Sequence, residues 1–229
     1  MTSITEIDLY PYGIEGILRN DFEIDLLNFE HLNFGVRTLN FLGNTRGFRF
    51  LGKNYIAIER LYDEDCYGEI YRCVAPDGSE YAIKTWRVSG HADFIWVLKE
   101  CLIQILVVEA SKSEPNGPYA PRLYEIAFDP EKSELLIRFE KMRNTLNNLL
   151  GAVDEDEQQE VFASASQQLE TAKEFLHATF EFSCHDLHKN AMYIRSPDDS
   201  ERWWRFTDFA STTLRFNGLV IHGRMWDIK

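Results

Sequence analysis

The pattern of apolar and polar residues predicts mainly strands in the first half of the chain and a long helix in the second. Three short segments are rich in β-branched and aromatic residues and are separated by turn residues: 55–61, 69–74 and 81–88. This pattern is typical of antiparallel strands. Between 94 and 108, apolar residues recur every three or four positions, which predicts a helix with one apolar face. Segments 123–128 and 134–139 predict a hairpin, so the expected order is β-β-β-α-β-β.

A longer helix is predicted after the acidic run 154–160. Apolar residues follow at spacings of four, four, three, four and four: Val161, Ala165, Leu169, Ala172, Leu176 and Phe180. With 3.6 residues per turn, these positions share one helix face. The acids lie where the helix dipole favours negative charge, so they indicate a helix start rather than a calcium loop. Two short strand-like segments follow at 191–194 and 203–207.

The first 52 residues have no regular period. Pro11 and Gly13 interrupt the start, and the leucines and phenylalanines of segment 14–41 are irregularly spaced. We expect a helical or loop-rich N-terminal extension over 1–52, ending in turns at the glycine-containing stretch 42–53. A domain boundary is therefore predicted near residue 53.

Composition and charge exclude several classes of protein. The 229 residues carry 24 Lys plus Arg against 37 Asp plus Glu, a formal charge of −13. General binding to nucleic acid needs a basic face, so we expect no nucleic-acid partner. The four cysteines show no paired spacing, which favours a reducing compartment. The sequence shows no signal peptide and no apolar run of about 18 residues, so we expect no membrane partner and an intracellular, cytoplasmic location.

Five features that could carry chemistry occur in a fixed order along the chain. They are a turn in YDEDCYGEIY that contains Gly68, Lys84 in a strand, Glu100 on the next helix, Asp186 and Asn190 in CHDLHKN, and Asp208 in Thr-Asp-Phe-Ala. Singly, each feature is weak, because a strand lysine is most often solvated and a helix glutamate most often lies on the surface. Together, their order is that of a phosphoryl-transfer site.

From about residue 55 to residue 216, the sequence resembles the protein-kinase-like superfamily. Asp-Leu-His at Asp186 resembles the loop of small-molecule kinases and of divergent fungal and large-virus protein kinases. The resemblance implies an α+β bilobal fold, with an antiparallel β N-lobe containing one helix and a short, mainly helical C-lobe. Since 229 minus 208 leaves 21 residues after Asp208, we expect the terminal helices of the C-lobe to be lacking. The implied domains are an N-terminal extension at 1–52, an N-lobe with hinge at 53–143, and a shortened C-lobe at 144–229.

The resemblance also implies roles in catalysis. Lys84 would contact the α- and β-phosphates of ATP and pair with Glu100. Asp186 would accept the proton of the hydroxyl that receives the phosphate. Asn190 and Asp208 would hold magnesium, a hard cation that prefers oxygen ligands.

Nucleotide binding is assigned to Gly68 at the glycine loop and to Glu140 and Met142 at the hinge, where main-chain groups would recognise adenine. The loop departs from the kinase-like pattern, because Asp63 and Asp65 stand at its first two glycine positions. Their carboxylates would repel phosphate, and aspartate allows less close backbone approach than glycine.

Two functions from different classes follow. The first is a divergent kinase-like phosphotransferase, using magnesium ATP to phosphorylate a protein or small-molecule hydroxyl. The alternative is a pseudokinase that acts as a nucleotide-binding or protein-interaction module without catalysis. The alternative is favoured by the aspartates of the glycine loop, by the interval of four residues between Asp186 and Asn190 where the family has five, and by the expected lack of the terminal helices of the C-lobe. Ala210, in place of glycine after Asp208 and Phe209, is a further departure from the family pattern.

The segment around Asp186 also has two local interpretations that need no kinase. Cys184, His185 and His188 could ligate a metal, although no second ligand pair stands at a zinc spacing. Alternatively, the histidines could bind backbone groups in the core, with Asp186 capping a loop.

Overall fold

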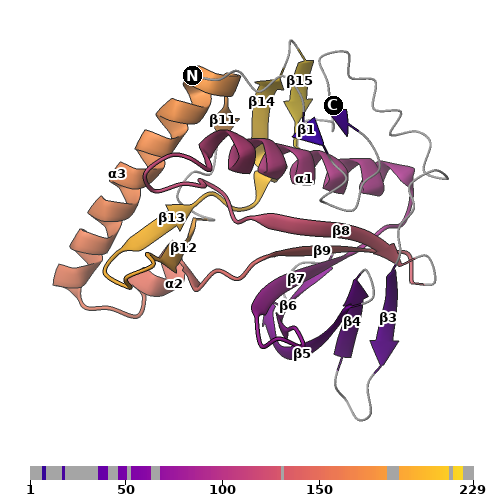
Figure 1. Cartoon of the computed structure of the whole chain (residues 1–229). Coiled ribbons are helices and arrows are strands. Elements are labelled where there is room, and N and C mark those ends of the chain that lie inside the picture. The colour runs from indigo at the N-terminus through magenta and orange to yellow at the C-terminus, as the bar shows by residue number, and fades with distance from the viewer. Residues whose placement is uncertain are drawn as a thin grey trace. The chain divides into compact units, whose positions relative to one another are not determined.

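The computed structural model describes residues 7–8, 17–18, 36–40, 46–50, 53–62, 68–129, 132–184, 191–216 and 219–223. The fold is α+β, with antiparallel sheets and few helices (Figure 1). The chain divides into two compact units. The first comprises Met1–Ile95 and Leu123–Lys141, and the second comprises Trp96–Arg122 and Met142–Lys229.

A seven-stranded antiparallel sheet forms the centre of the first unit. In spatial order its strands are β3 (Val36–Asn40), β4 (Arg46–Phe50), β5 (Lys53–Tyr62), β6 (Gly68–Val74), β7 (Glu80–Arg87), β9 (Glu134–Glu140) and β8 (Leu123–Asp129). The helix α1 (His91–Ser111) follows β7 along the chain. The predicted order β-β-β-α-β-β is confirmed by β5, β6, β7, α1, β8 and β9.

The prediction of a helical or loop-rich segment before residue 53 is wrong for the part that the structure describes. Strand β1 (Ile7–Asp8) pairs with β2 (Ile17–Leu18), and β3 and β4 extend the main sheet by pairing of β4 with β5. Added strands are stabilised by hydrogen bonds to a neighbouring strand, so irregular local spacing does not reveal them. The domain boundary near residue 53 remains a prediction.

The core of the first unit combines apolar side chains with a partly buried arginine, Arg138. Its buried cluster consists of Phe48, Tyr55, Tyr71, Cys73, Ala75, Ile83, Ala127 and Leu136. The Arg138 guanidinium lies 5.3, 4.8 and 5.3 Å from the ring centroids of Tyr55, Tyr81 and Tyr124. Arg138 also pairs with Glu125 at 3.3 Å. Burial raises the pKa of Glu125, and the nearby arginine charge opposes that rise.

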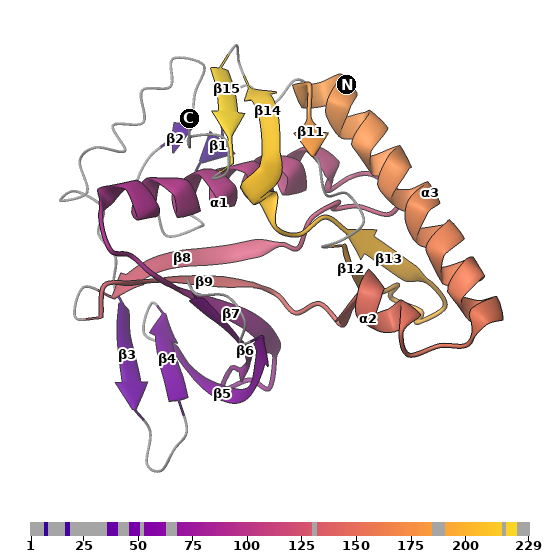
Figure 2. The same cartoon turned by 180° about the vertical axis from the view of Figure 1, so that it is seen from behind.

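The second unit is organised by one long helix and two small sheets. The helix α3 (Glu155–Phe180) buries all six apolar residues that the sequence predicts for its inner face. One sheet contains β10 (Asn144–Thr145), β12 (Met192–Arg195) and β13 (Arg202–Arg205), and α2 (Leu146–Leu150) follows β10. The other contains β11 (Ser183–Cys184), β14 (Thr212–Phe216) and β15 (Leu219–His222). Strand β13 contacts α3, and the two views show them side by side (Figure 2).

None of the helices in the described part of the chain is long and apolar enough to cross a membrane.

The start of α3 provides a test of the helix assignment. Asp154 is the N-cap, and its side chain accepts a hydrogen bond from the Glu157 N–H at 3.0 Å. Asp154→Ala is expected to lower the free energy of unfolding by about 1 kcal/mol, because it removes this cap. Urea denaturation measures the change. The control is Glu174→Ala on the exposed side of α3, expected to change stability by less than about 0.5 kcal/mol. Equal effects of the two substitutions would contradict the cap.

Candidate functional site

Lys84 lies in the middle of the sheet of the first unit. On β7 it pairs with Ile70 of β6 and with Ile137 of β9, and its side chain is half-buried. The ammonium nitrogen lies 4.3 Å from the centroid of the Trp86 ring. Trp86 is two positions along the strand and therefore on the same face. A cation over an indole ring gains about 0.5 to 2 kcal/mol, so this contact helps to hold the lysine charge in place.

Gly68, the glycine of the predicted glycine loop, is the first residue of β6. It pairs with Trp86 across the sheet, and a Cβ atom at this position would lie 2.0 Å from the carbonyl oxygen of Thr85. No side chain fits at that distance without movement of the backbone. Gly68 is therefore required for the close approach of β6 to β7, in addition to any role in nucleotide binding.

Asp208 has an unusual backbone conformation and an exposed side chain. Its φ and ψ are 62° and 85°, in the left-handed region. Its carboxylate accepts a hydrogen bond from the Ala210 N–H at 3.3 Å and caps the 3-10 helix η3 (Phe209–Ser211). Aspartate adopts the left-handed region more readily than most residues. A non-glycine residue in this region still costs free energy, and such residues are concentrated at functional sites.

The segment after Asp208 is fixed by the buried side chain of Phe209 and by contact of its main chain with Gly223. The Phe209 side chain is buried, with 2% of its surface exposed. A Cβ at Gly223 would lie 2.1 Å from the carbonyl oxygen of Phe209 and 2.6 Å from that of Ala210. The Gly223 N–H also donates to the carbonyl oxygen of Thr212 at 2.7 Å. Gly223, directly after β15, therefore packs against η3 and helps to hold the backbone that presents Asp208.

Three further predicted residues lie in the described part of the chain. Glu100 is half-buried on α1, and its Oε1 atom is buried. Glu140 ends β9 opposite Tyr81 and is half-buried. The Met142 side chain is 4% exposed, so any contribution to ligand binding would come from its main chain. Gly68, Lys84 and Glu140 belong to the first unit, and Glu100, Met142 and Asp208 belong to the second.

The other predicted residues lie outside the described part of the chain. They are Asp63 and Asp65 of the glycine loop, Asp186 and Asn190 of the catalytic loop, and His185 and His188 of the alternative metal site. Their roles stay predictions. Among the side chains that are described, no group of three or more His, Cys, Asp or Glu residues could hold a metal ion.

Two residues of this region were missed in the sequence reasoning. Trp86 could have been found, because it stands two positions after Lys84 on a predicted strand and so shares its face. Gly223 carried no local signal, since the atoms that exclude a side chain there belong to Phe209 and Ala210, far from it in the sequence.

Comparison of the sequence with protein-family models and with curated proteins finds no match.

Proposed function

We propose that this chain is a divergent kinase-like phosphotransferase, which moves the γ-phosphate of ATP to a hydroxyl of a protein or small molecule. The observation that carries the proposal is the exposed carboxylate of Asp208, held on a left-handed backbone. The kinase-like resemblance expects a metal ligand at this position. Asp208 follows the hairpin β12–β13, and its side chain caps the first turn of η3. Gly223 packs against the main chain of η3 and so helps to fix its position. This fixed presentation supports a role as a ligand.

Asp208 fits magnesium by the chemistry of its donor atoms. Magnesium prefers carboxylate oxygens and keeps several waters, so an exposed aspartate is a suitable ligand. The second protein ligand would be Asn190. When bound, magnesium would supply positive charge that stabilises the phosphate oxygens during transfer.

Lys84 would bind the phosphates of ATP. Its ammonium group carries three N–H donors, so contact with the Trp86 ring leaves donors for phosphate oxygens. Half-burial strengthens the interaction between the lysine charge and an anionic ligand, because less water screens it. Glu100 would fix the lysine, and Asp186 would orient the acceptor hydroxyl and take its proton. Gly68, Glu140 and Met142 would line the nucleotide site.

The role of Lys84 is tested by its replacement with methionine. Lys84→Met keeps much of the side-chain volume and removes the charge, so the rate of ATP turnover is expected to fall by at least about a hundred-fold. The control is Lys112→Met, which removes an exposed lysine whose ion pair among the described residues is with Glu109 of α1 at 2.6 Å. Its turnover should match that of the wild type. Turnover by Lys84→Met at the rate of the control would show that the role of Lys84 is wrong.

A second candidate function is a pseudokinase, and the Lys84–Trp86 contact favours it. This contact gives the lysine a structural role that needs no nucleotide. Asp63 and Asp65 also oppose phosphate binding by their charge. Thermal denaturation with magnesium ATP, measured beside phosphate release in a single turnover, separates the two functions. Stabilisation without release would support the pseudokinase, and transfer to an acceptor would exclude it.

A further inference from the structure

A groove of about 730 Å³ lies within the second unit. Its walls are one face of α3, the segment that contains Glu114 and Tyr119, and the hairpin β12–β13. The volume lies within the range of roughly 300 to 1,000 Å³ that is typical of ligand sites. None of the described residues assigned to phosphate transfer, such as Lys84 and Asp208, lines it.

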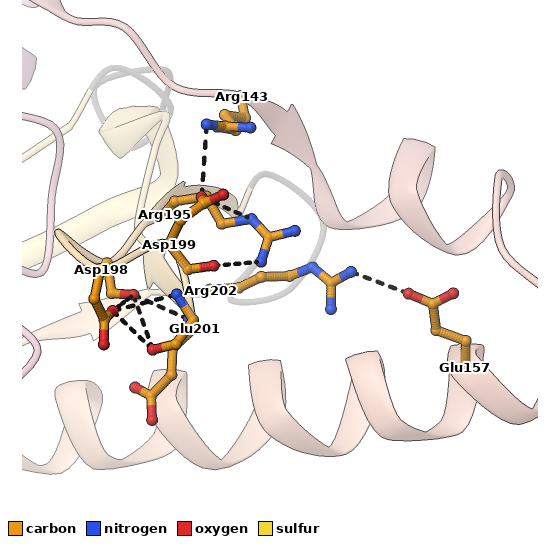
Figure 3. Close-up of polar contacts among 9 residues, drawn as sticks. Arg143, Glu157, Arg195, Asp198, Asp199, Glu201 and Arg202 are labelled. Atoms are coloured by element: carbon orange, nitrogen blue, oxygen red, sulfur yellow. Dashed lines mark hydrogen bonds and ion pairs between the residues drawn. The ribbon is translucent and has the colours of Figure 1, made fainter.

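The groove is strongly acidic. Its lining includes four carboxylates and one guanidinium: Glu114, Glu157, Glu160, Glu201 and Arg202. One positive and four negative charges give a formal sum of −3. Arg202 Nη2 donates to Glu157 Oε1 at 3.0 Å, which neutralises one of the four (Figure 3). Within the described residues no ion pair involves Glu114, Glu160 or Glu201, so their charges face the groove without a cation.

One wall of the groove is held against α3 by a side-chain amide. Gln168 Nε2 donates to the carbonyl oxygen of Arg202 at 2.9 Å, and Gln168 Oε1 accepts from the Trp204 N–H at 3.2 Å. The amide thus satisfies two main-chain groups of β13, much as a neighbouring strand would do. The wall is therefore in place without a ligand.

The turn of the hairpin is also ordered by hydrogen bonds. Asp198, labelled in Figure 3, accepts from the hydroxyls of two serines. The distances are 2.6 Å from Ser196 and 2.7 Å from Ser200. The Glu201 N–H donates to Ser196 Oγ at 2.9 Å. The Ser196 hydroxyl, followed by the hydroxyl and N–H of Ser200, lowers the pKa of Asp198 to about 2. Asp198 therefore stays ionised at neutral pH, and the turn holds Glu201 at the rim.

Two buried donors that belong to groove-lining residues have no acceptor among the described residues. Trp204 lines the groove and is only 2% exposed, and its indole Nε1–H has no hydrogen-bond partner among the described residues. The same holds for Arg202 Nε. Buried donors are normally paired, and an unpaired one costs free energy. A ligand that suits this groove therefore combines positive charge with hydrogen-bond acceptors.

We propose that this groove binds an Arg- or Lys-rich peptide segment of a partner protein. Cationic side chains of the peptide would pair with Glu114, Glu160 and Glu201, and a main-chain carbonyl would accept from Trp204 Nε1–H. A polyamine matches the charge but has no acceptors when protonated. Nucleic acid would be repelled by the carboxylates. The charge and the unpaired donors thus favour a basic peptide over both.

Fluorescence anisotropy of a labelled peptide of alternating arginine and alanine, titrated with the full chain at low salt, tests this site. The wild type is expected to bind the peptide and not its analogue with glutamate in place of arginine. The double variant Glu160→Gln/Glu201→Gln should bind at least about ten-fold more weakly, because it removes two of the unpaired charges. Both residues are exposed, so the substitutions leave the fold intact. The control is Glu170→Gln/Glu174→Gln, exposed on α3 outside the groove, and should bind as the wild type does.

Trp204→Phe tests the hydrogen bond separately from the charge. It keeps an aromatic ring and removes the indole donor, which has no described partner, together with part of the ring volume. It is expected to weaken peptide binding by about three- to ten-fold. Unchanged binding by Trp204→Phe would overturn the role of this donor. Absence of binding by the wild type, or equal loss in both double variants, would overturn the site. Equally tight binding of spermine would overturn the assignment to a peptide.

Discussion

Replacing Arg205 with methionine is expected to lower the free energy of unfolding by about 2 to 4 kcal/mol. Arg205 lies on β13 with none of its surface exposed. Its Nη1 donates to the carbonyl oxygens of Asn116 at 2.6 Å and Trp204 at 3.3 Å, and its Nη2 donates to that of Gly117 at 3.4 Å. Methionine fills part of the same volume but has no donor, and a hydrogen bond to a charged group contributes about 1.5 to 3 kcal/mol. The partial exposure of the acceptor residues keeps the total below the sum of three such bonds.

Urea denaturation followed by circular dichroism measures this loss. The matched control is Arg215→Met, which removes the bond from Arg215 Nε to Glu181 Oε2 at 3.0 Å. Both side chains of that pair are about half-exposed or more, so the control should change stability by no more than about 1 kcal/mol. If the two variants unfold at the same urea concentration, the buried arginine does not have the structural role described. Since Asn116 also lines the acidic groove, loss of Arg205 should loosen that wall as well.

Replacing Asp208 with alanine is expected to reduce magnesium-dependent phosphate transfer by at least about a thousand-fold. The reason is electrostatic, because a metal ligand at this position would contribute several kcal/mol of charge stabilisation in the transition state. The measurement is the rate of γ-phosphate transfer at saturating magnesium ATP. Fold stability should fall by about 2 kcal/mol, which combines the cost of alanine on a left-handed backbone and of the lost cap.

Asp199→Ala is the matched control for this substitution. Asp199 is also exposed and also has a positive φ, of 59°, but it lies in the turn of β12–β13. Its ion pairs with Arg143 at 3.8 Å and Arg195 at 3.7 Å are exposed and weak (Figure 3). The control therefore reproduces the backbone cost without the proposed metal ligand. Equal activity of the two variants would show that Asp208 is not a metal ligand.

Much of the fold could be predicted from local patterns. The six apolar positions of α3 are all buried, as predicted. This could be predicted because the helical spacing of apolar residues is a pattern within one short segment. The strands β5, β6 and β7 were predicted from their β-branched and aromatic residues and from the turn residues between them, which are also local signals. Strands β3 and β4 were missed, since pairing with β5 stabilises them and no local period marks them. The buried Arg205 was also missed, because two of its acceptors, the carbonyl oxygens of Asn116 and Gly117, lie almost 90 residues away along the chain.

The candidate site was predicted less completely than the fold. Motif order identified Lys84 and Asp208, and the structure adds the Trp86 ring and the left-handed backbone that accompany them. The order of the motifs predicts neither the Trp86 contact nor the left-handed backbone, because both depend on the three-dimensional structure. Asp186 and Asn190 stay predictions, because they lie outside the described residues.

The central claim is that the chain transfers phosphate from magnesium ATP. The most direct test is a single-turnover reaction with the full chain in excess over labelled ATP, with magnesium and then with a chelator, beside the Asp208→Ala variant. Loss of the γ-phosphate from ATP in a single exponential phase, abolished by the chelator and by the substitution, is the predicted result. Retention of the γ-phosphate by the wild type, under conditions where ATP raises its melting temperature, would contradict the claim and identify a pseudokinase.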